Sequence, residues 1–268
     1  MSAIRTVIVG ASGRMGRTLI RCAQHWSDGR VVAAIDRADS PEMGRDAGEL
    51  AGVSALSLPL HADLNQALAN GADLVIDFSA ATATPGNLEA CATAGVAILV
   101  GTTGLSDAIK SKAAAAAVRV PVMIAANTSL GVAVLAQLVR RVAAALPAEF
   151  DIEIIEGHHR HKKDAPSGTA LTLGAAAAEG RATTLQAAAQ LGRSGASERR
   201  QGEIGFAVVR GGDLVGEHLV RFLGPGEQLE LGHVATDREI FARGALQAGA
   251  WLTRQPPGSY QMSDLFPV

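Results

Sequence analysis

An apolar run that enters a glycine-rich turn constrains the fold of this chain more than any other feature. The segment Val7-Ile8-Val9-Gly10-Ala11-Ser12-Gly13-Arg14-Met15-Gly16 leads into an amphipathic helix. Glycine at the end of a strand permits a tight turn, a second glycine lets the backbone approach a pyrophosphate, and a third lets the helix pack closely on the strand. Free N–H groups at the start of the helix then face the anion. The GxxGxxG spacing is a variant of the GxGxxG fingerprint, and its place between strand and helix predicts a nicotinamide dinucleotide site.

An acidic residue at the end of the next expected strand supports this interpretation. Asp36 lies about twenty residues beyond the turn, where a carboxylate accepts hydrogen bonds from the adenosine ribose. Arg37 follows directly and is placed to meet a 2′-phosphate instead. The adjacent pair predicts the use of both NADH and NADPH. The alternative interpretation is a structural glycine turn with an ordinary Asp-Arg pair on the surface.

Short apolar runs alternate with alanine-rich helical stretches along the first half of the chain. This alternation is typical of a parallel sheet covered by helices on both faces, so we expect a Rossmann-like, doubly wound α/β domain. The expected strands are residues 6–9, 31–35, 74–78, 97–100 and 122–125. The expected helices are residues 13–26, 83–94 and 107–118.

The second half of the chain has more strands and fewer helices between them. It predicts a second α+β domain with a mixed sheet at residues 127–236, and leaves residues 1–126 and 237–268 to the dinucleotide-binding domain. The expected strands are residues 151–156, 204–209, 214–222 and 228–233, the expected helices are residues 130–146 and 237–252, and residues 181–201 are expected to form an irregular connection.

Two loops of small and hydroxyl-bearing residues follow strands at the same expected edge of the first sheet. They are Gly101-Thr102-Thr103-Gly104 and Ala125-Ala126-Asn127-Thr128-Ser129. Ligands of open α/β sheets bind outside the carboxyl ends of the strands. We therefore expect the nicotinamide ring to lie against these loops, with an amide or carbonyl group orienting its carboxamide. Taken singly, both strings are ordinary turns.

A cluster of cations stands out in a chain whose formal net charge is −2. It is the segment Glu156-Gly157-His158-His159-Arg160-His161-Lys162-Lys163-Asp164-Ala165-Pro166-Ser167-Gly168-Thr169-Ala170. An anionic substrate is the economical explanation, because a helix start after Pro166 supplies N–H groups for a carboxylate and His or Lys donates protons near neutral pH. Three alternatives compete: metal ligation by the histidines, a basic loop for nucleic acid, and a merely solvated loop. The first lacks an obvious carboxylate or thiol to complete a site, and the second lacks interleaved aromatic residues.

Composition sets further limits on the function. The slight negative charge gives no overall electrostatic case for nucleic acid or an anionic membrane as a partner. No uncharged apolar run approaches the roughly 18 to 20 residues that span a bilayer, and the start lacks the organisation of a signal peptide, so we expect a cytoplasmic protein. Cys22 and Cys91 lie in expected helices without a CxxC spacing, which predicts buried thiols rather than a disulfide or a zinc site.

The chain resembles the 4-hydroxy-tetrahydrodipicolinate reductase family, also called dihydrodipicolinate reductases, over nearly its whole length. The resemblance rests on the GxxGRMG opening, on Gly101-Thr102-Thr103-Gly104 and, most specifically, on residues 156–170. The closing motifs agree with it: Ile204-Gly205-Phe206, Arg210-Gly211-Gly212-Asp213, Gly216-Glu217-His218 and Ala235-Thr236-Asp237-Arg238. It implies NAD(P)H-dependent reduction of the dehydrated form of 4-hydroxy-tetrahydrodipicolinate to tetrahydrodipicolinate, with hydride transfer to C4 of this cyclic dicarboxylate, in the diaminopimelate pathway of lysine biosynthesis.

The resemblance also implies roles for particular residues. His158 and Lys162 match the family's catalytic pair, His158 as the proton donor and acceptor and Lys162 as a proton donor. His159, Gly168 and Thr169 match its substrate-binding positions. The positions that match its NADH or NADPH contacts are Gly10, Ala11, Ser12, Gly13, Arg14, Met15, Asp36, Arg37, Gly101, Thr102, Thr103, Ala125, Ala126, Asn127 and Thr128. No metal is expected. The resemblance also implies a homotetramer built through the sheet of the second domain.

The sequence departs from the family pattern at two places in the cofactor region. Thr128 stands where members often carry a bulky Phe or Met after the Asn, and the stretch Phe78-Ser79-Ala80-Ala81-Thr82 lacks the usual charged or proline-containing continuation. Two other functions stay open at this point. One is a related dehydrogenase acting on another small amino or keto acid, and the other is a non-catalytic sensor that binds a dinucleotide.

Overall fold

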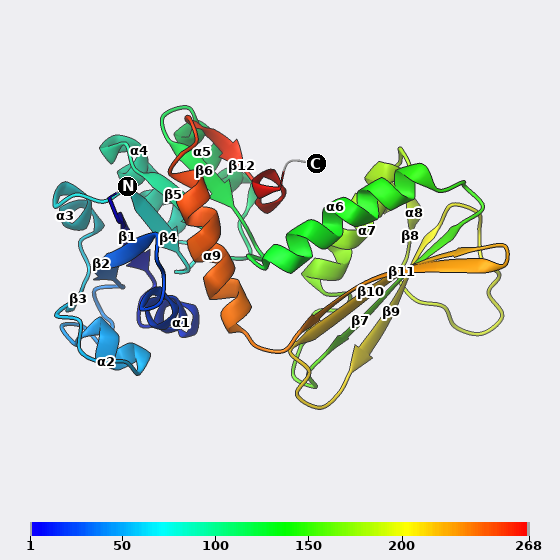
Figure 1. The fold of residues 1–268 in the computed structure, drawn as a ribbon, viewed down its shortest axis with the longest axis horizontal. Coiled ribbons are helices and arrows are strands. Elements are labelled where there is room, and N and C mark those ends of the chain that lie inside the picture. The colour runs from blue at the N-terminus through cyan, green and yellow to red at the C-terminus, as the bar shows by residue number, and fades with distance from the viewer. Residues whose placement is uncertain (1, 267–268) are drawn as a thin grey trace. The chain divides into compact units, whose positions relative to one another are not determined.

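The computed structural model describes residues 2–266, which form two compact units (Figure 1). The first unit combines residues 2–129 with residues 239–265, and the second contains residues 130–238 together with Phe266. Among the described residues, no helix combines the length and the apolar character needed to cross a membrane.

The first unit is built on a sheet of seven strands in the order β12-β6-β5-β4-β1-β2-β3, and all neighbouring strands are parallel. The chain fills one half of the sheet with β1 to β3 and then crosses to β4 on the other side of β1. The crevice between β1 and β4 is therefore the topological switch point, where open α/β sheets bind their ligands. The strands are β1 (Ile4–Val9), β2 (Gly29–Ile35), β3 (Leu60–His61), β4 (Leu74–Asp77), β5 (Ala97–Val100), β6 (Pro121–Ile124) and β12 (Gly258–Tyr260).

Helices cover both faces of this sheet, which confirms the expected doubly wound class. They are α1 (Arg14–Ala23), α2 (Ala47–Ala51), α3 (Leu64–Ala69), α4 (Thr84–Ala94), α5 (Asp107–Ala117) and α9 (Glu239–Leu252), followed by a short 3-10 turn, η1 (Met262–Leu265). The sequence did not predict α2, α3, β3 or β12. Each of them has at most six residues, too few for hydrophobic periodicity to be visible.

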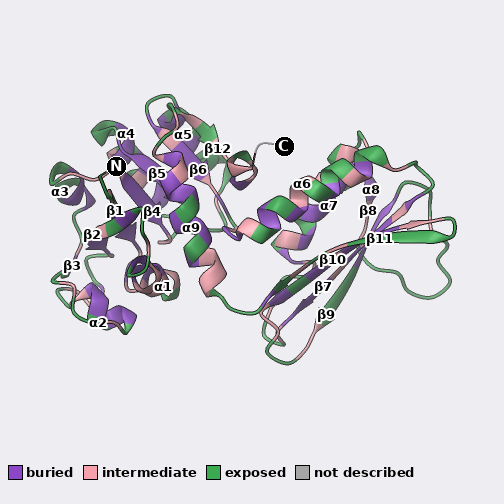
Figure 2. Ribbon diagram, viewed as in Figure 1, coloured by how far each residue is buried: buried purple, intermediate pink, exposed green. Residues whose placement is uncertain are grey.

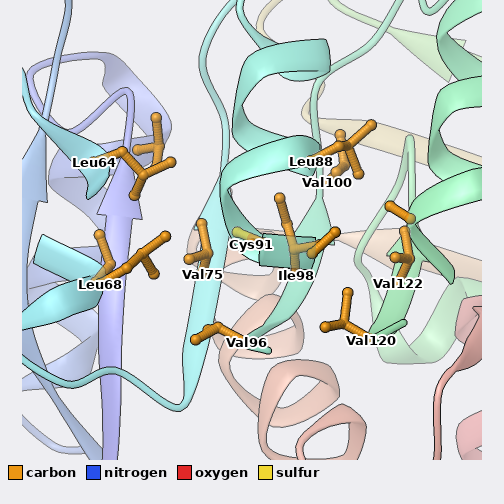
Figure 3. Packing of buried hydrophobic residues seen from close by; sticks show 14 of the residues in the cluster. Leu64, Leu68, Val75, Leu88, Cys91, Val96, Ile98, Val100, Val120 and Val122 are labelled. Atoms are coloured by element: carbon orange, nitrogen blue, oxygen red, sulfur yellow. The ribbon is translucent and has the colours of Figure 1, made fainter. Parts of the chain in front are cut away.

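The apolar strands are buried on both sides, as a covered parallel sheet requires. On one side, Val75 of β4, Ile98 of β5 and Val122 of β6 pack with side chains of α3, α4 and α5 (Figure 3). Leu74 of β4 is also fully buried and faces α9, where a Cβ on Gly249 would lie only 2.5 Å from its side chain. Successive residues of each strand therefore contribute to opposite cores.

The second unit is a mixed sheet of five strands in the order β11-β10-β7-β9-β8. β10 runs antiparallel to β7 and β11, whereas β9 runs parallel to β7 and β8. α6 and α7 pack on one face and bury Ile154, Phe206 and Phe222 against it (Figures 1 and 2). The elements are α6 (Leu130–Ala145), β7 (Asp151–His158), α7 (Gly168–Gly180), α8 (Leu185–Ala188), β8 (Ala189–Gln190), β9 (Ile204–Arg210), β10 (Gly216–Gly224) and β11 (Glu227–Ala235).

Two local expectations need correction. Residues 181–201 are not irregular throughout, because they contain α8 and the edge strand β8. The segment that follows is held to β7 by charge rather than by periodic packing, since Arg193 and Arg199 both pair with Glu153. Of the two cysteines, Cys91 is buried in α4, but Cys22 of α1 is only half-buried.

Candidate active site

Each of the three glycines in the turn after β1 occupies its position for a different physical reason. Gly10 has φ +79°, and a Cβ there would lie 2.6 Å from the backbone oxygen of Phe78. A Cβ on Gly16 would overlap the backbone oxygen of Gly10, so this glycine lets α1 approach β1. Gly13 is the N-cap of α1, and no side chain caps the helix. The close approach and the uncapped helix start fit the pyrophosphate of a dinucleotide.

Asp36 follows β2 and is joined to the glycine turn. Its carboxylate accepts hydrogen bonds from the backbone N–H groups of Ser12, at 2.7 Å, and Arg37, at 2.8 Å. Each carboxylate oxygen has a second lone pair, so Asp36 retains acceptor capacity for a ribose hydroxyl. The side chain of Arg37 is 70% exposed and pairs with Asp39 at 3.5 Å. Both groups are thus accessible beside the turn.

The ends of the central strands are linked in one row by backbone hydrogen bonds. Phe78 donates to Val9 O at 3.0 Å, Gly101 donates to Asp77 O at 2.8 Å, and Ala125 donates to Val100 O at 2.9 Å. These contacts bring together three of the loops expected to hold the cofactor. Gly101 is required here because a Cβ would overlap the ring of Phe78.

A fully buried carboxylate, which the sequence did not single out, shapes the loop after β4. Asp77 accepts from the backbone N–H of Ser79 at 2.8 Å, from its hydroxyl at 2.5 Å, and from Asn87 Nδ2 at 3.0 Å. The sequence feature that could have revealed Asp77 is an acid at the end of an apolar strand. Acids are also common at strand ends where they only face solvent, so this feature did not single out Asp77. The Ser79–Thr82 departure therefore lies in a loop that is fixed by internal hydrogen bonds.

Thr128 follows β6, and its side chain forms a hydrogen bond within the first unit. Its side chain is almost fully buried, and its hydroxyl donates to the backbone oxygen of Phe241 in α9 at 2.7 Å. Nearby, the side-chain oxygen of Asn127 accepts from the N–H of Ser129 at 2.9 Å. The position where the family pattern has a bulky residue thus joins the loop to the last helix of the first unit.

The cationic segment forms the second group of candidate residues, in the second unit. His158 is the last residue of β7, and its Nδ1 lies 2.6 Å from Oε2 of Glu156. Arg210 of β9 binds the same carboxylate through two nitrogens, at 2.7 and 2.8 Å. The carboxylate of Glu156 has no exposed surface. A buried charge of this kind is tolerated because it is paired and hydrogen-bonded.

Glu156 also contacts the start of α7. The backbone N–H of Ser167 donates to its Oε1 at 2.9 Å, and the Ser167 hydroxyl caps α7 by accepting from Ala170 N at 3.1 Å. The same hydroxyl lies 3.1 Å from Nε2 of His218, whose ring stands edge-on to His158 with centroids 5.1 Å apart. Glu156, Ser167 and His218 therefore connect β7, α7 and β10 around His158.

Burial and pairing shift several of these groups. Burial by itself raises the pKa of Glu156, but hydrogen bonds from Arg210, His158 and the Ser167 N–H outweigh it and hold the pKa below its usual value. Burial, with a smaller contribution from His158, lowers the pKa of His218 to about 4. Desolvation, followed by the charge of Arg238, lowers the pKa of His159. Near neutral pH the carboxylate is charged and His218 is neutral.

The remaining predicted residues of this segment lie in the loop between β7 and α7. Lys162 is half-buried, and its Nζ pairs with Asp164 Oδ2 at 2.9 Å, which lowers the pKa of that carboxyl. Gly168 and Thr169 form the first turn of α7, at the positive end of its dipole. Within residues 2–266, no group of three His, Cys, Asp or Glu side chains is arranged to hold a metal ion.

The sequence missed four groups that contact the predicted residues: Arg210, His218, Ser167 as a helix cap, and Asp77. Arg210 and His218 were noticed only as parts of motifs. No local pattern reveals them as partners of His158, because β9 and β10 meet β7 only in the folded sheet.

Together, the switch-point glycine turn and the charged cluster around His158 define the class of protein: an oxidoreductase with a Rossmann-like dinucleotide-binding unit and a separate α+β unit. Comparison with known proteins gives the family. The model for the N-terminus of dihydrodipicolinate reductase matches residues 4–128, and that for the C-terminus matches residues 131–266. The chain belongs to the dihydrodipicolinate reductase family.

Curated relatives agree over nearly the full length. The 4-hydroxy-tetrahydrodipicolinate reductase of Anaeromyxobacter dehalogenans is 47% identical over 262 residues, covering 97% of this chain and 97% of the relative. That of Halorhodospira halophila is 48% identical, covering 97% and 98%.

Solved structures share the fold at lower identity. A dipicolinate-bound dihydrodipicolinate reductase from Paenisporosarcina sp. TG-14 has a TM-score of 0.80 at 23% identity, covering 99% of this chain and 100% of that one. A myo-inositol dehydrogenase from Corynebacterium glutamicum has a TM-score of 0.62 at 16% identity, covering 96% and 90%. The two-unit architecture is thus shared with dehydrogenases of other small molecules.

Proposed function

We propose that this chain reduces the dehydrated form of 4-hydroxy-tetrahydrodipicolinate to tetrahydrodipicolinate, the reductase step of the diaminopimelate route to lysine. The observation that carries the proposal is the arrangement of His158, Lys162 and the start of α7 in one segment of the second unit. The match to the dihydrodipicolinate reductase family model and the 47% identity to a 4-hydroxy-tetrahydrodipicolinate reductase support this substrate.

The cofactor is a reduced nicotinamide dinucleotide, either NADH or NADPH. The uncapped start of α1 and the close-packed Gly10 and Gly16 fit its pyrophosphate, and Asp36 and Arg37 lie beside the turn for its ribose end. When bound, the cofactor supplies a hydride. The loops after β5 and β6 are expected to hold the nicotinamide, through Gly101, Thr102 and Thr103 and through residues 125–128.

The substrate is a cyclic dicarboxylate, held by the second unit. Its anionic groups are complementary to the cations of residues 158–163 and to the N-terminal end of α7 at Gly168 and Thr169. His159 lies in the same loop, where its lowered pKa favours the neutral imidazole as a hydrogen-bonding group. The dipicolinate bound by the structural relative is a ligand of this chemical class.

The reduction adds one hydride and one proton across the conjugated double bond of the dehydrated substrate. His158 transfers the proton through Nε2, because Nδ1 is occupied by Glu156. Lys162 is the second donor group for this same proton, and Asp164 restrains its Nζ at 2.9 Å. Positioned acid–base groups of this kind contribute roughly a hundredfold or more to a rate.

A coupled assay tests this function. Pyruvate and aspartate semialdehyde are mixed with the preceding aldolase and this protein, and the absorbance of NADH or NADPH is followed. Oxidation that depends on the aldolase is the expected result. Turnover only with other amino or keto acids would indicate a related dehydrogenase, and binding of NADH without any turnover would indicate a sensor.

We also propose a cytoplasmic homotetramer, assembled through the face of the second sheet that α6 and α7 leave uncovered. Along that face the strand register aligns Val209, Gly157, Glu217 and Val234 in one row, and Val209 and Val234 are 51% and 63% exposed. Exposed apolar side chains gathered on a sheet face favour association. Light scattering of the purified protein checks the mass, and Val234→Glu is expected to lower it.

A further inference from the structure

The carboxylate of Glu156 has hydrogen-bond partners in addition to the arginine with which it forms an ion pair. It accepts from His158, from two nitrogens of Arg210 and from the backbone N–H of Ser167. Its side chain has no exposed surface, so these contacts replace all of its hydration. The set joins the end of β7, the end of β9 and the start of α7 at a single group.

The chemistry of these contacts decides which nitrogen of His158 carries a hydrogen. An ionised carboxylate only accepts hydrogen bonds, so Nδ1 of His158 must donate to it. Nε2 is then the nitrogen that gains or loses the proton. This nitrogen faces the backbone of Gly216, where a Cβ would come within 3.1 Å of it, so glycine leaves space beside the reactive atom.

Arg210 supports this arrangement from the neighbouring strand. In the parallel register, Arg210 of β9 lies opposite His158, and therefore diagonal to Glu156 on the same face. Its fork binds both carboxylate oxygens, and Nη2 also donates to the backbone oxygen of Asp164 at 2.6 Å. The guanidinium thus stabilises the charged carboxylate and fixes the loop that carries Lys162.

We propose that Glu156 is a positioning residue: it holds His158 with Nδ1–H bound and Nε2 directed to the substrate, and Arg210 keeps the carboxylate ionised while it does so. This proposal rests on the proposed function, in which His158 transfers the proton. Because the same carboxylate binds Ser167 at the start of α7, it also sets the position of the acid–base group relative to the helix end that receives the substrate's carboxylate.

Several charges surround His158 and contribute to any pH dependence. Glu156 lies on its own strand, Arg210 on β9 and His218 on β10, and Lys162 and His159 lie in the loop that follows. Of these, only Glu156 is an anion in direct contact with the ring. Its removal therefore destabilises the protonated imidazole.

The test compares Glu156→Gln with Glu153→Gln in the full-length protein. Both positions are on β7, but Glu153 points to the opposite face and pairs with Arg193 and Arg199. For Glu156→Gln we expect kcat to fall by about a hundredfold or more. The limb of its pH profile that reports loss of the catalytic proton is expected to move down by about one pH unit or more. Glu153→Gln is expected to leave the kcat profile unchanged.

A purely structural role for Glu156 would lower the yield or the melting temperature and leave the pH profile in place, which would overturn the proposal. His158→Gln, measured alongside, distinguishes failure of the catalytic role of His158 from failure of the positioning role of Glu156. If kcat survives in His158→Gln, the proposed catalytic role of His158 is wrong. If His158→Gln is inactive but Glu156→Gln keeps both kcat and its pH profile, only the positioning role is wrong.

A measurement on the unmodified protein covers the case in which Glu156→Gln does not fold. Nitrogen-15 NMR of histidine-labelled protein reports which ring nitrogen carries the hydrogen, and His158 is assigned by the signals missing in His158→Gln. We expect the neutral ring of His158 to be the Nδ1–H tautomer. The Nε2–H tautomer, which is the usual form of a free histidine side chain, would contradict the proposal.

Discussion

The carboxylate of Asp36, at the end of β2, accepts a hydrogen bond from the backbone N–H of Ser12 at 2.7 Å. An acid expected to bind the ribose therefore also holds the glycine turn in place. For Asp36→Ala we expect the KM for NADH to rise by roughly tenfold or more, because a hydrogen bond to a charged group contributes about 1.5–3 kcal/mol. The KM for NADPH should rise less, because Arg37 is placed to meet the 2′-phosphate, a group that NADH lacks. Steady-state kinetics with both cofactors check this, and an equal rise for both would contradict it.

Lys162 and Lys163 are adjacent cations with different surroundings. Lys162 is half-buried and paired with Asp164, whereas Lys163 is exposed. We expect Lys162→Ala to lower kcat by about a hundredfold or more, the scale of a positioned proton donor. Lys163→Ala should change kcat little. Retained kcat with a raised KM in Lys162→Ala would identify Lys162 as a binding residue instead.

The third glycine of the turn, Gly16, is predicted to be needed for the close packing of α1 on β1. A Cβ on Gly16 would overlap the backbone oxygen of Gly10, so Gly16→Ala must separate α1 from β1. We expect it to lower the free energy of unfolding by about 1–3 kcal/mol and to weaken NADH binding. Gly86 of α4 is the matched control, because a Cβ there meets nothing within 4 Å. Gly86→Ala should be neutral or stabilising in thermal unfolding, and equal losses for both variants would refute this explanation.

Burial of neutral His218 predicts a pH-dependent stability. Its pKa is about 4 in the folded protein and close to 6.5 in the unfolded chain, so between these values the unfolded chain binds more protons. Stability is therefore lost as the pH falls from about 6.5 towards 4, by about 3 kcal/mol in total. We expect the melting temperature of His218→Gln to depend less on pH across this window. His25→Gln, at an exposed position of the first unit, should keep the slope of the parent protein.

Much of the fold was accessible from local patterns. The five apolar strands of the first unit, their helices, and four strands of the second appear within a few residues of their expected bounds. Short elements such as β3 and β8 were not accessible, because two residues carry no periodicity and pair only when a neighbouring strand is present. Thr128 illustrates the same limit at a single residue. Its role as a hydrogen-bond donor to Phe241 depends on α9, which is far away in the sequence.

By itself the sequence determined the α/β class, the glycine turn and the cationic segment, because turn geometry, helix starts and strand alternation depend on neighbouring residues. Only the tertiary structure decided what those residues contact. Glu156 and Arg210 are 54 positions apart, and the parallel register of β7 with β9 makes them diagonal neighbours, with the carboxylate of Glu156 fully buried. A charge pair between distant segments leaves no periodic trace, because its free energy exists only once both strands are paired and buried.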